Sequence, residues 1–191
     1  MLLIEQGISQ TVMVGAVDSH FDLLLLGQLD SEDRVLAEGI MDGFAPAEGA
    51  AFMLVRAATE KSRIRLYPPG ITEETGHRYS SAAYKGEGLA AAVSEALSQL
   101  ANNPVKTVLA GFNGEHFNTK EWGVAAIRNS RNFDSNHNVI HPADCLGDPG
   151  AALGLILIQL AIIGLTKGYY TGPLMAWCSS ELAPRGAICL S

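Results

Sequence analysis

Blocks of apolar residues alternate with polar, glycine-rich turns along the 191-residue chain, and their periods predict both strands and helices. Two continuous apolar segments, 11–18 and 50–57, are typical of strands that are covered on both faces. Further strands are predicted at 62–70 (ended by Pro68-Pro69-Gly70), at 105–112, within 136–144, and in a closing hairpin of 173–180 and 186–191.

Helical patterns fill the intervals between these strands. They are predicted at the N-terminus up to Gly7, at 20–30, at 85–101, at 118–131 with Asn118 or Thr119 as N-cap, and at 150–165. The last of these is the longest apolar stretch, but at about 15 residues it falls short of the roughly 20 that span a bilayer. We therefore expect a buried helix there, in one α/β domain over 1–191 with a mixed central sheet and buried helices.

Composition narrows the class of protein. Apolar residues make up 48% of the chain and charged residues 17%, with a formal net charge of −7, which argues against a nucleic-acid surface. The three cysteines are widely separated and the N-terminus lacks a positive region before a cleavage site. We expect a reduced, cytoplasmic protein with no nucleic-acid or membrane partner.

Several motifs occur in an order that resembles the β-ketoacyl synthases, which are condensing enzymes of the thiolase-like fold. They are the F-x-P-x-EGAA turn from Phe44 into a strand, the glycine-led helix near 85–101, the NGE and EWG segments at 113–123, and the GDPGAALG helix start at 147–154. The resemblance covers essentially the whole chain. It implies a layered αβαβα architecture, of which this chain carries the C-terminal half and the end of the N-terminal half.

The resemblance also implies a catalytic set that the chain departs from. The family's cysteine nucleophile corresponds to a position before Met1, so we expect the portion that carries it to be missing. The family's first catalytic histidine aligns with Asn113, its second with Gly147, and its usual lysine near Pro142. Imidazoles at these two positions stabilise an oxyanion and assist decarboxylation of a malonyl unit.

Other polar residues of the same loops are candidates for replacement chemistry. Glu115 and His116 follow Asn113, and a Cys145 nucleophile with His141 as base is chemically conceivable. Asp148 is most simply a helix N-terminal charge. The catalytic candidates are Asn113, His116, His141 and Cys145, and the substrate-binding candidates are Glu115, Asp144, Gly147, Asp148, Ser179 and Ser180.

Cofactor sites are not indicated by any spacing. No zinc or EF-hand pattern occurs, and the GDPGAALG segment lacks the Lys and Ser/Thr of a P-loop. We expect no metal and no cofactor. The segment 178–187, where the family has an aromatic and glycine-rich gate, is polar here, which argues against a long acyl substrate.

Two functions follow from the resemblance. The first is a ketosynthase-like protein without Cys-His-His activity in this chain, acting as a binding or partner subunit beside an acyl carrier protein or acyl-CoA. It would form a homodimer or pair with a ketosynthase-like partner. The alternative is a divergent acyltransferase or condensing enzyme whose nucleophile lies in a missing upstream segment.

Overall fold

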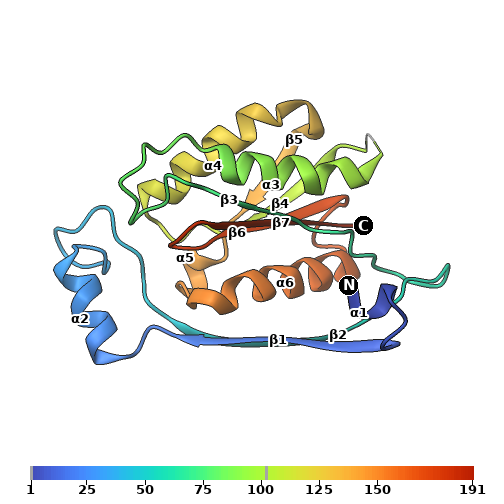
Figure 1. Ribbon diagram of the computed structural model, residues 1–191, viewed down its shortest axis with the longest axis horizontal. Helices are drawn as coiled ribbons and strands as arrows, with labels where there is room; N and C mark the ends of the chain where they lie inside the picture. Colours follow the sequence, from blue (N-terminus) through green and yellow to red (C-terminus); the bar gives the residue numbers. More distant parts are fainter. Residues whose placement is uncertain (1, 102) are drawn as a thin grey trace.

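The computed structural model of the chain describes residues 2–101 and 103–191, and it confirms the α/β class. Helix α6 (Leu153–Lys167) lies between a five-stranded and a two-stranded sheet (Figure 1). Helices α3 (Glu87–Leu97) and α4 (His116–Arg128) cover the opposite face of the larger sheet. The layers therefore run helices, sheet, helix, sheet, which gives four of the five layers of the expected αβαβα architecture.

The larger sheet is mixed, as predicted. Its strand order is β3-β7-β6-β4-β5, in which β4 runs parallel to both β5 and β6 and the other pairs are antiparallel. The predicted C-terminal hairpin, β6–β7, forms the centre of this sheet together with β4. The strand bounds are β3 (Gly70–Glu73), β4 (Val105–Ala110), β5 (Phe133–Ile140), β6 (Leu174–Ser179) and β7 (Pro184–Leu190).

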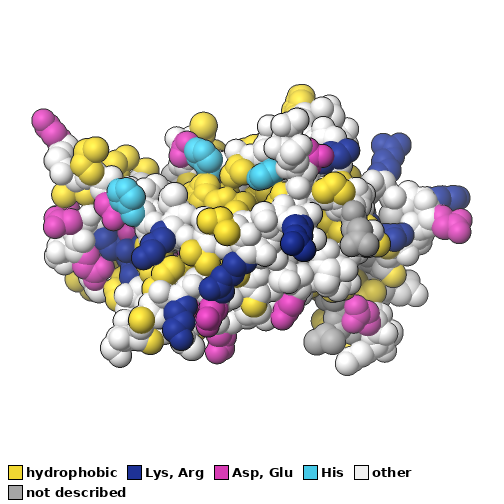
Figure 2. Space-filling view, turned by 90° about the horizontal axis from the view of Figure 1, so that it is seen from above, with side chains coloured by type: hydrophobic (Ala, Val, Ile, Leu, Met, Phe, Trp, Pro, Cys, Tyr) yellow, Lys and Arg dark blue, Asp and Glu magenta, His cyan; other side chains and the backbone are white. Residues whose placement is uncertain are grey.

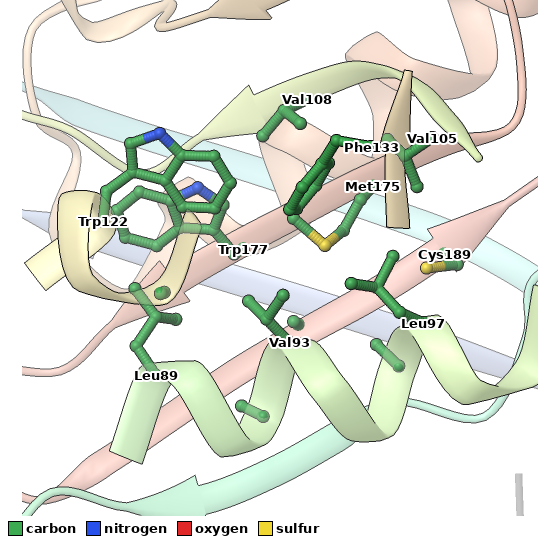
Figure 3. Close-up of a cluster of buried hydrophobic side chains, with 14 of the residues drawn as sticks. Leu89, Val93, Leu97, Val105, Val108, Trp122, Phe133, Met175, Trp177 and Cys189 are labelled. Carbon is green, nitrogen blue, oxygen red and sulfur yellow. The ribbon is translucent and has the colours of Figure 1, made fainter. Parts of the chain in front are cut away.

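Each face of the larger sheet has its own apolar core. On the α3–α4 side, Trp122 stacks on Trp177 with ring centroids 5.4 Å apart and planes 10° apart (Figure 3). On the α6 side, Leu157 and its neighbours pack against Leu109 and Leu174. By length and composition, residues 150–167 form the one helix in the described chain that is apolar enough to cross a membrane. A helix placed between two sheets needs apolar residues around its circumference, which accounts for this composition.

The smaller sheet is an antiparallel pair, β1 (Thr11–Ser19) and β2 (Glu48–Arg56), whose inner face packs on α6. Its outer face is apolar and open, because nothing else in the described chain lies on that side. The prediction that these strands are covered on both faces is therefore wrong for the outer face. The side chains concerned are Met13, Val17, Phe52 and Leu54, which are 54–73% exposed.

Several element boundaries differ from the sequence predictions, and two of these differences change the interpretation. Residues 62–69 form no regular strand: only Leu66 bridges to Leu190, and β3 starts at Gly70, since prolines 68 and 69 have no N–H to donate. Helix α4 begins at His116, with Glu115 rather than Asn118 or Thr119 at its N-cap. The remaining elements are α1 (Leu2–Glu5), α2 (Leu23–Ser31), α5 (Ala143–Leu146) and short 3₁₀ turns η1 (Ser98–Leu100), η2 (Ser130–Asn132) and η3 (Gly150–Ala152).

Candidate functional site

A cavity of about 590 Å³ opens at the N-terminal end of α6. It is lined by the end of β1, the loop that follows β4, the segment 148–154, the turn between β6 and β7, and Arg78. Asn113, Asp148, Ser179 and Ser180 all line it, so the structure brings together four of the residues singled out from the sequence. The rest of the site is built around the first two.

Asn113 and Asp148 are in direct contact. The side-chain amide of Asn113 donates one hydrogen bond to Asp148 Oδ2 and another to Glu115 Oε2, each 2.9 Å long. Its carbonyl oxygen accepts from the Glu115 N–H and from the Asn118 amide. Both N–H hydrogens of Asn113 are therefore committed to carboxylates, and none is free for a substrate oxygen.

Asp148 is held from several sides. Its Oδ1 accepts from the Gly150 N–H at 2.8 Å, which is the helix-start role expected from the sequence. Burial raises the pKa of Asp148, and the hydrogen bonds from Asn113 and Gly150 oppose that shift only in part. This carboxyl thus faces the cavity as a group that takes up a proton more readily than an exposed aspartate.

Gly147, which aligns with the second histidine, has a structural role in this geometry. Its φ of +72° is left-handed, and a Cβ there would come within 2.8 Å of the Ala45 carbonyl oxygen. Gly147 itself does not line the cavity, whereas the adjacent Asp148 does. The side chain that faces Asn113 is thus a carboxylate one residue beyond the aligned position.

Glu115 lies under the cavity as the centre of a buried ion-pair network. It is 1% exposed, accepts hydrogen bonds from Arg34 Nε at 2.7 Å and from Arg34 Nη2 at 2.9 Å, and forms an ion pair with Arg78 Nη2 at 3.0 Å. Burial acts to lower the pKa of Arg34, but the bonds from Glu115 and Glu181 raise it overall, so its charge is secure. These pairs join the loop after α2, the segment around Arg78 and the start of α4.

The turn between β6 and β7 is polar, as expected, and it is firmly held. Arg185 is fully buried, with Nε 2.5 Å from Glu121 Oε1, and its Nη1 donates to four backbone carbonyls of residues 180–184. Ser179 also donates to Glu121. The Nη2 atom of Arg185 is buried and has no partner among the described residues, although the side chain lines the cavity.

His20 is a site residue that sequence reasoning missed. Its Nδ1 lies 2.8 Å from the Asp148 carbonyl oxygen and must donate to it, which leaves Nε2 as the acceptor in the neutral ring. The neighbouring Asp18 accepts from the Ala151 N–H at 2.7 Å. In the sequence, the signal for this part of the site is the run of polar residues Asp18, Ser19 and His20, but adjacency along the chain does not indicate that side chains converge.

The remaining candidates lie outside the cavity. His116 is 80% exposed and pairs with Asp42, and His141 pairs with Asp144 at 2.7 Å. Cys145 is exposed, and no hydrogen bond joins it to His141 in the described structure. The structure therefore does not bring these residues to Asn113. Residues 2–101 and 103–191 contain no cluster of three or more His, Cys, Asp or Glu side chains suited to a metal ion.

Comparison with known proteins places this geometry in a fold class. No protein-family model and no curated protein sequence matches the chain. Solved structures do match, and six of them are described as ketosynthases or as a ketosynthase/chain length factor. The chain has the thiolase-like fold of the ketosynthases, as the sequence resemblance implied.

Three of these structures show the extent of the likeness. The ketosynthase from module 6 of the bacillaene synthase of Bacillus subtilis 168 superposes with a TM-score of 0.83 at 11% identity, over 99% of this chain and 43% of that chain. The ishigamide ketosynthase/chain length factor gives 0.79 at 14%, over 99% and 55%. The AntDE:AntF structure, described as a type II PKS acyl-carrier protein in complex with its ketosynthase bound to the hexaketide, gives 0.78 at 14%, over 99% and 58%. The chain thus spans about half the length of these proteins.

Proposed function

We propose that this chain is a ketosynthase-like, acyl-binding subunit of a polyketide or fatty-acid condensing system, and that it does not carry out condensation by itself. The observation that carries the proposal is the Asn113–Asp148 contact at the floor of the cavity. Asn113 stands where the family resemblance implies one imidazole, and Asp148 follows Gly147, the residue that aligns with the other.

The chemistry of condensation requires donors where negative charge develops. Decarboxylation of a malonyl thioester leaves an enolate, which preorganised hydrogen-bond donors stabilise. Here both N–H groups of Asn113 already serve carboxylates, and an ionised Asp148 repels an oxyanion. The pair therefore disfavours the enolate, although it leaves the cavity intact for a bound acyl group.

Two features support the proposal that the cavity binds a ligand. The cavity lies within the range of 300–1,000 Å³ that is usual for ligand pockets. The buried Nη2 of Arg185 has hydrogens to donate to a carbonyl or carboxylate of a ligand. An acyl carrier protein or acyl-CoA is the proposed source of the acyl group, in line with the carrier protein named in one similar structure.

A second chain is part of the proposal. The open apolar face of β1–β2 is the surface on which a homodimer partner or a ketosynthase-like partner would pack. A cytoplasmic location is proposed with it.

A second candidate function rests on His20. Its Nε2 has no hydrogen-bond partner among the described residues while Nδ1 is fixed by the Asp148 carbonyl, which is the arrangement of a general base oriented by its other nitrogen. In a divergent acyltransferase, this base would serve a nucleophile from outside residues 1–191.

One experiment separates the two functions. The purified chain is incubated with a malonyl-loaded acyl carrier protein and, separately, with a decanoyl-phosphopantetheine thioester. Intact mass spectrometry follows loss of carbon dioxide and acylation, and calorimetry follows binding. The binding function predicts saturable binding of the thioester with neither acylation nor decarboxylation.

Matched variants locate the binding. Ala151 is exposed and lines the cavity, so Ala151→Trp should weaken thioester binding at least about tenfold, as expected when a side chain fills a ligand pocket. Ala82→Trp, exposed and outside the cavity, should leave binding unchanged. Decarboxylation that disappears in His20→Ala would instead support the enzyme, and no binding by the parent chain would exclude the binding function.

A further inference from the structure

A second and larger cavity, of about 680 Å³, lies at the other end of α6. It is lined by the end of β2 and the two residues after it, by the extended segment 62–68, by the end of α1 and by Ile162 of α6. Its lining is largely apolar and includes Met53, Val55, Ile64, Leu66 and Ile162. Gly154 of α6 lines the first cavity and Ile162 lines this one, so about 12 Å of helix separates the two.

Three arginines line this cavity. Arg56, Arg63 and Arg65 are exposed there, and none of them forms an ion pair with any described carboxylate. In contrast, Arg34, Arg78 and Arg185 around the first site all have carboxylate partners. Figure 2 shows Lys and Arg side chains gathered at the end of the molecule where Figure 1 places the loop after β2.

This local positive charge contrasts with the negative net charge of the whole chain. The net charge is −7, yet four of the thirteen Lys and Arg residues fall within residues 56–65, beside one acid, Glu60. Glu5 is the one carboxylate that lines the cavity itself. Unpaired guanidinium groups at the rim of an apolar cavity select a ligand with an apolar body and an anionic end, because the planar fork matches carboxylate and phosphate oxygens.

We infer that this cavity, which we call the arginine-rimmed groove, binds a linear acyl chain that carries an anionic head group. The acyl chain of the ligand lies against the apolar lining, and its carboxylate or phosphate is held by Arg63 and Arg65. The groove is a hollow of ligand size rather than a flat surface, which favours a single amphiphile over a bilayer. The inference stands apart from the function proposed for the Asn113 site.

Calorimetry with three ten-carbon probes tests the head group. Decanoate and decyl phosphate should both bind saturably, whereas 1-decanol should bind at least about tenfold more weakly. Tighter binding of decanoate than of decyl phosphate would indicate that the natural ligand is a free fatty acid, and the reverse order would indicate a phosphate ester. Binding should weaken with added salt, because the arginines are exposed.

Variants then place the ligand. Arg63→Gln combined with Arg65→Gln should weaken decanoate binding about 2- to 30-fold, the range expected from two exposed ion pairs. Ala57→Trp, at an exposed position of the lining, should weaken binding by blocking the groove. Arg128→Gln with Arg131→Gln removes the same charge elsewhere and should change nothing, and Ala151→Trp should be equally silent, since it blocks the other cavity.

Three results would overturn the inference. They are equal binding of decanol and decanoate, binding that survives both groove variants in a chain with a normal unfolding transition, and binding to vesicles of anionic phospholipid without any binding of monomeric decanoate. The last would assign the cluster to a membrane surface. If Ala57→Trp does not fold, the arginine pair alone decides, because exposed arginines without ion pairs are not needed for the core.

Discussion

Replacing Glu115 by Gln should lower the free energy of unfolding of the protein by a measurable amount, because it breaks the buried ion-pair network next to the site. The Glu115 carboxylate is 1% exposed and faces Arg34, whose side chain is 6% exposed, at 2.7 Å. It also bonds Arg78 and Asn113, so the variant leaves one buried guanidinium with a neutral partner and places an amide N–H₂ against other donors. Removing one member of a buried pair costs about 3–5 kcal/mol. We take about 3 kcal/mol as the expected loss, because Glu181 still pairs with Arg34.

Urea unfolding at pH 7, followed by fluorescence of the buried Trp122–Trp177 stack, measures this loss. A loss of about 3 kcal/mol is a large fraction of the 5–15 kcal/mol typical of a domain. Glu181→Gln is the matched control: its side chain is 47% exposed, and it should cost less than about 1 kcal/mol. In a double-mutant cycle, Arg34→Met should recover part of the loss in the Glu115 variant. A loss below about 1 kcal/mol with no coupling to Arg34 would refute the network as described.

Three further predictions concern the site and its surroundings. Burial raises the pKa of Asp148 above its usual 3.8, so ionisation of this carboxyl destabilises the folded state as the pH rises. The unfolding free energy of Asp148→Asn should therefore increase relative to that of the parent protein between pH 4 and pH 7. A difference that stays constant with pH would contradict the pKa shift. Burial also raises the pKa of the Cys189 thiol to about 12, so a thiol reagent at pH 8 should modify the exposed Cys145 at once and Cys189 only after unfolding, as counted by mass spectrometry. Gly150→Ala should lower the melting temperature more than Gly168→Ala does. Both glycines have left-handed φ values, +61° and +73°. A Cβ at Gly150 would clash with a carboxylate oxygen at the end of β1, whereas a Cβ at Gly168 would have no atom within 4 Å. Equal losses at the two glycines would show that only backbone strain matters.

The elements that the sequence predicts well are those with strong local signals. The apolar run of α6 and the β6–β7 hairpin have clear periods and bounding turns, and both are confirmed. The prediction of a strand over 62–70 is wrong for residues 62–69, because it rested on their apolar content and did not allow for the missing N–H groups of the two prolines. Helix α4 starts earlier than predicted because Glu115, an unusual N-cap, is held there by the buried Arg34 and the partly buried Arg78, both distant in the sequence.

The site could be predicted only in part. Asn113 and Asp148 were singled out through their positions in family-like motifs, and they do meet across 35 residues of sequence. Arg34, Arg78 and His20 reach the same place from loops that no periodicity connects to it. His116 and His141 were chosen for their chemical type, yet each pairs with a nearby aspartate at the surface. Residue type names the possible chemistry, but the convergence of loops decides which groups share a cavity.

The strand order of the larger sheet has a consequence for how the protein is made. β6 and β7 sit at the middle of that sheet, yet residues 174–190 follow all its other strands in the sequence. Until they emerge from the ribosome, β4 has no partner on its β6 side, and α3 and α6 have little sheet to pack on. The smaller sheet, by contrast, can close as soon as residue 56 is available. Assembly of the larger sheet is therefore delayed until residues 174–190 have been synthesised, and the nascent chain must keep an exposed apolar α6 from aggregating in the meantime.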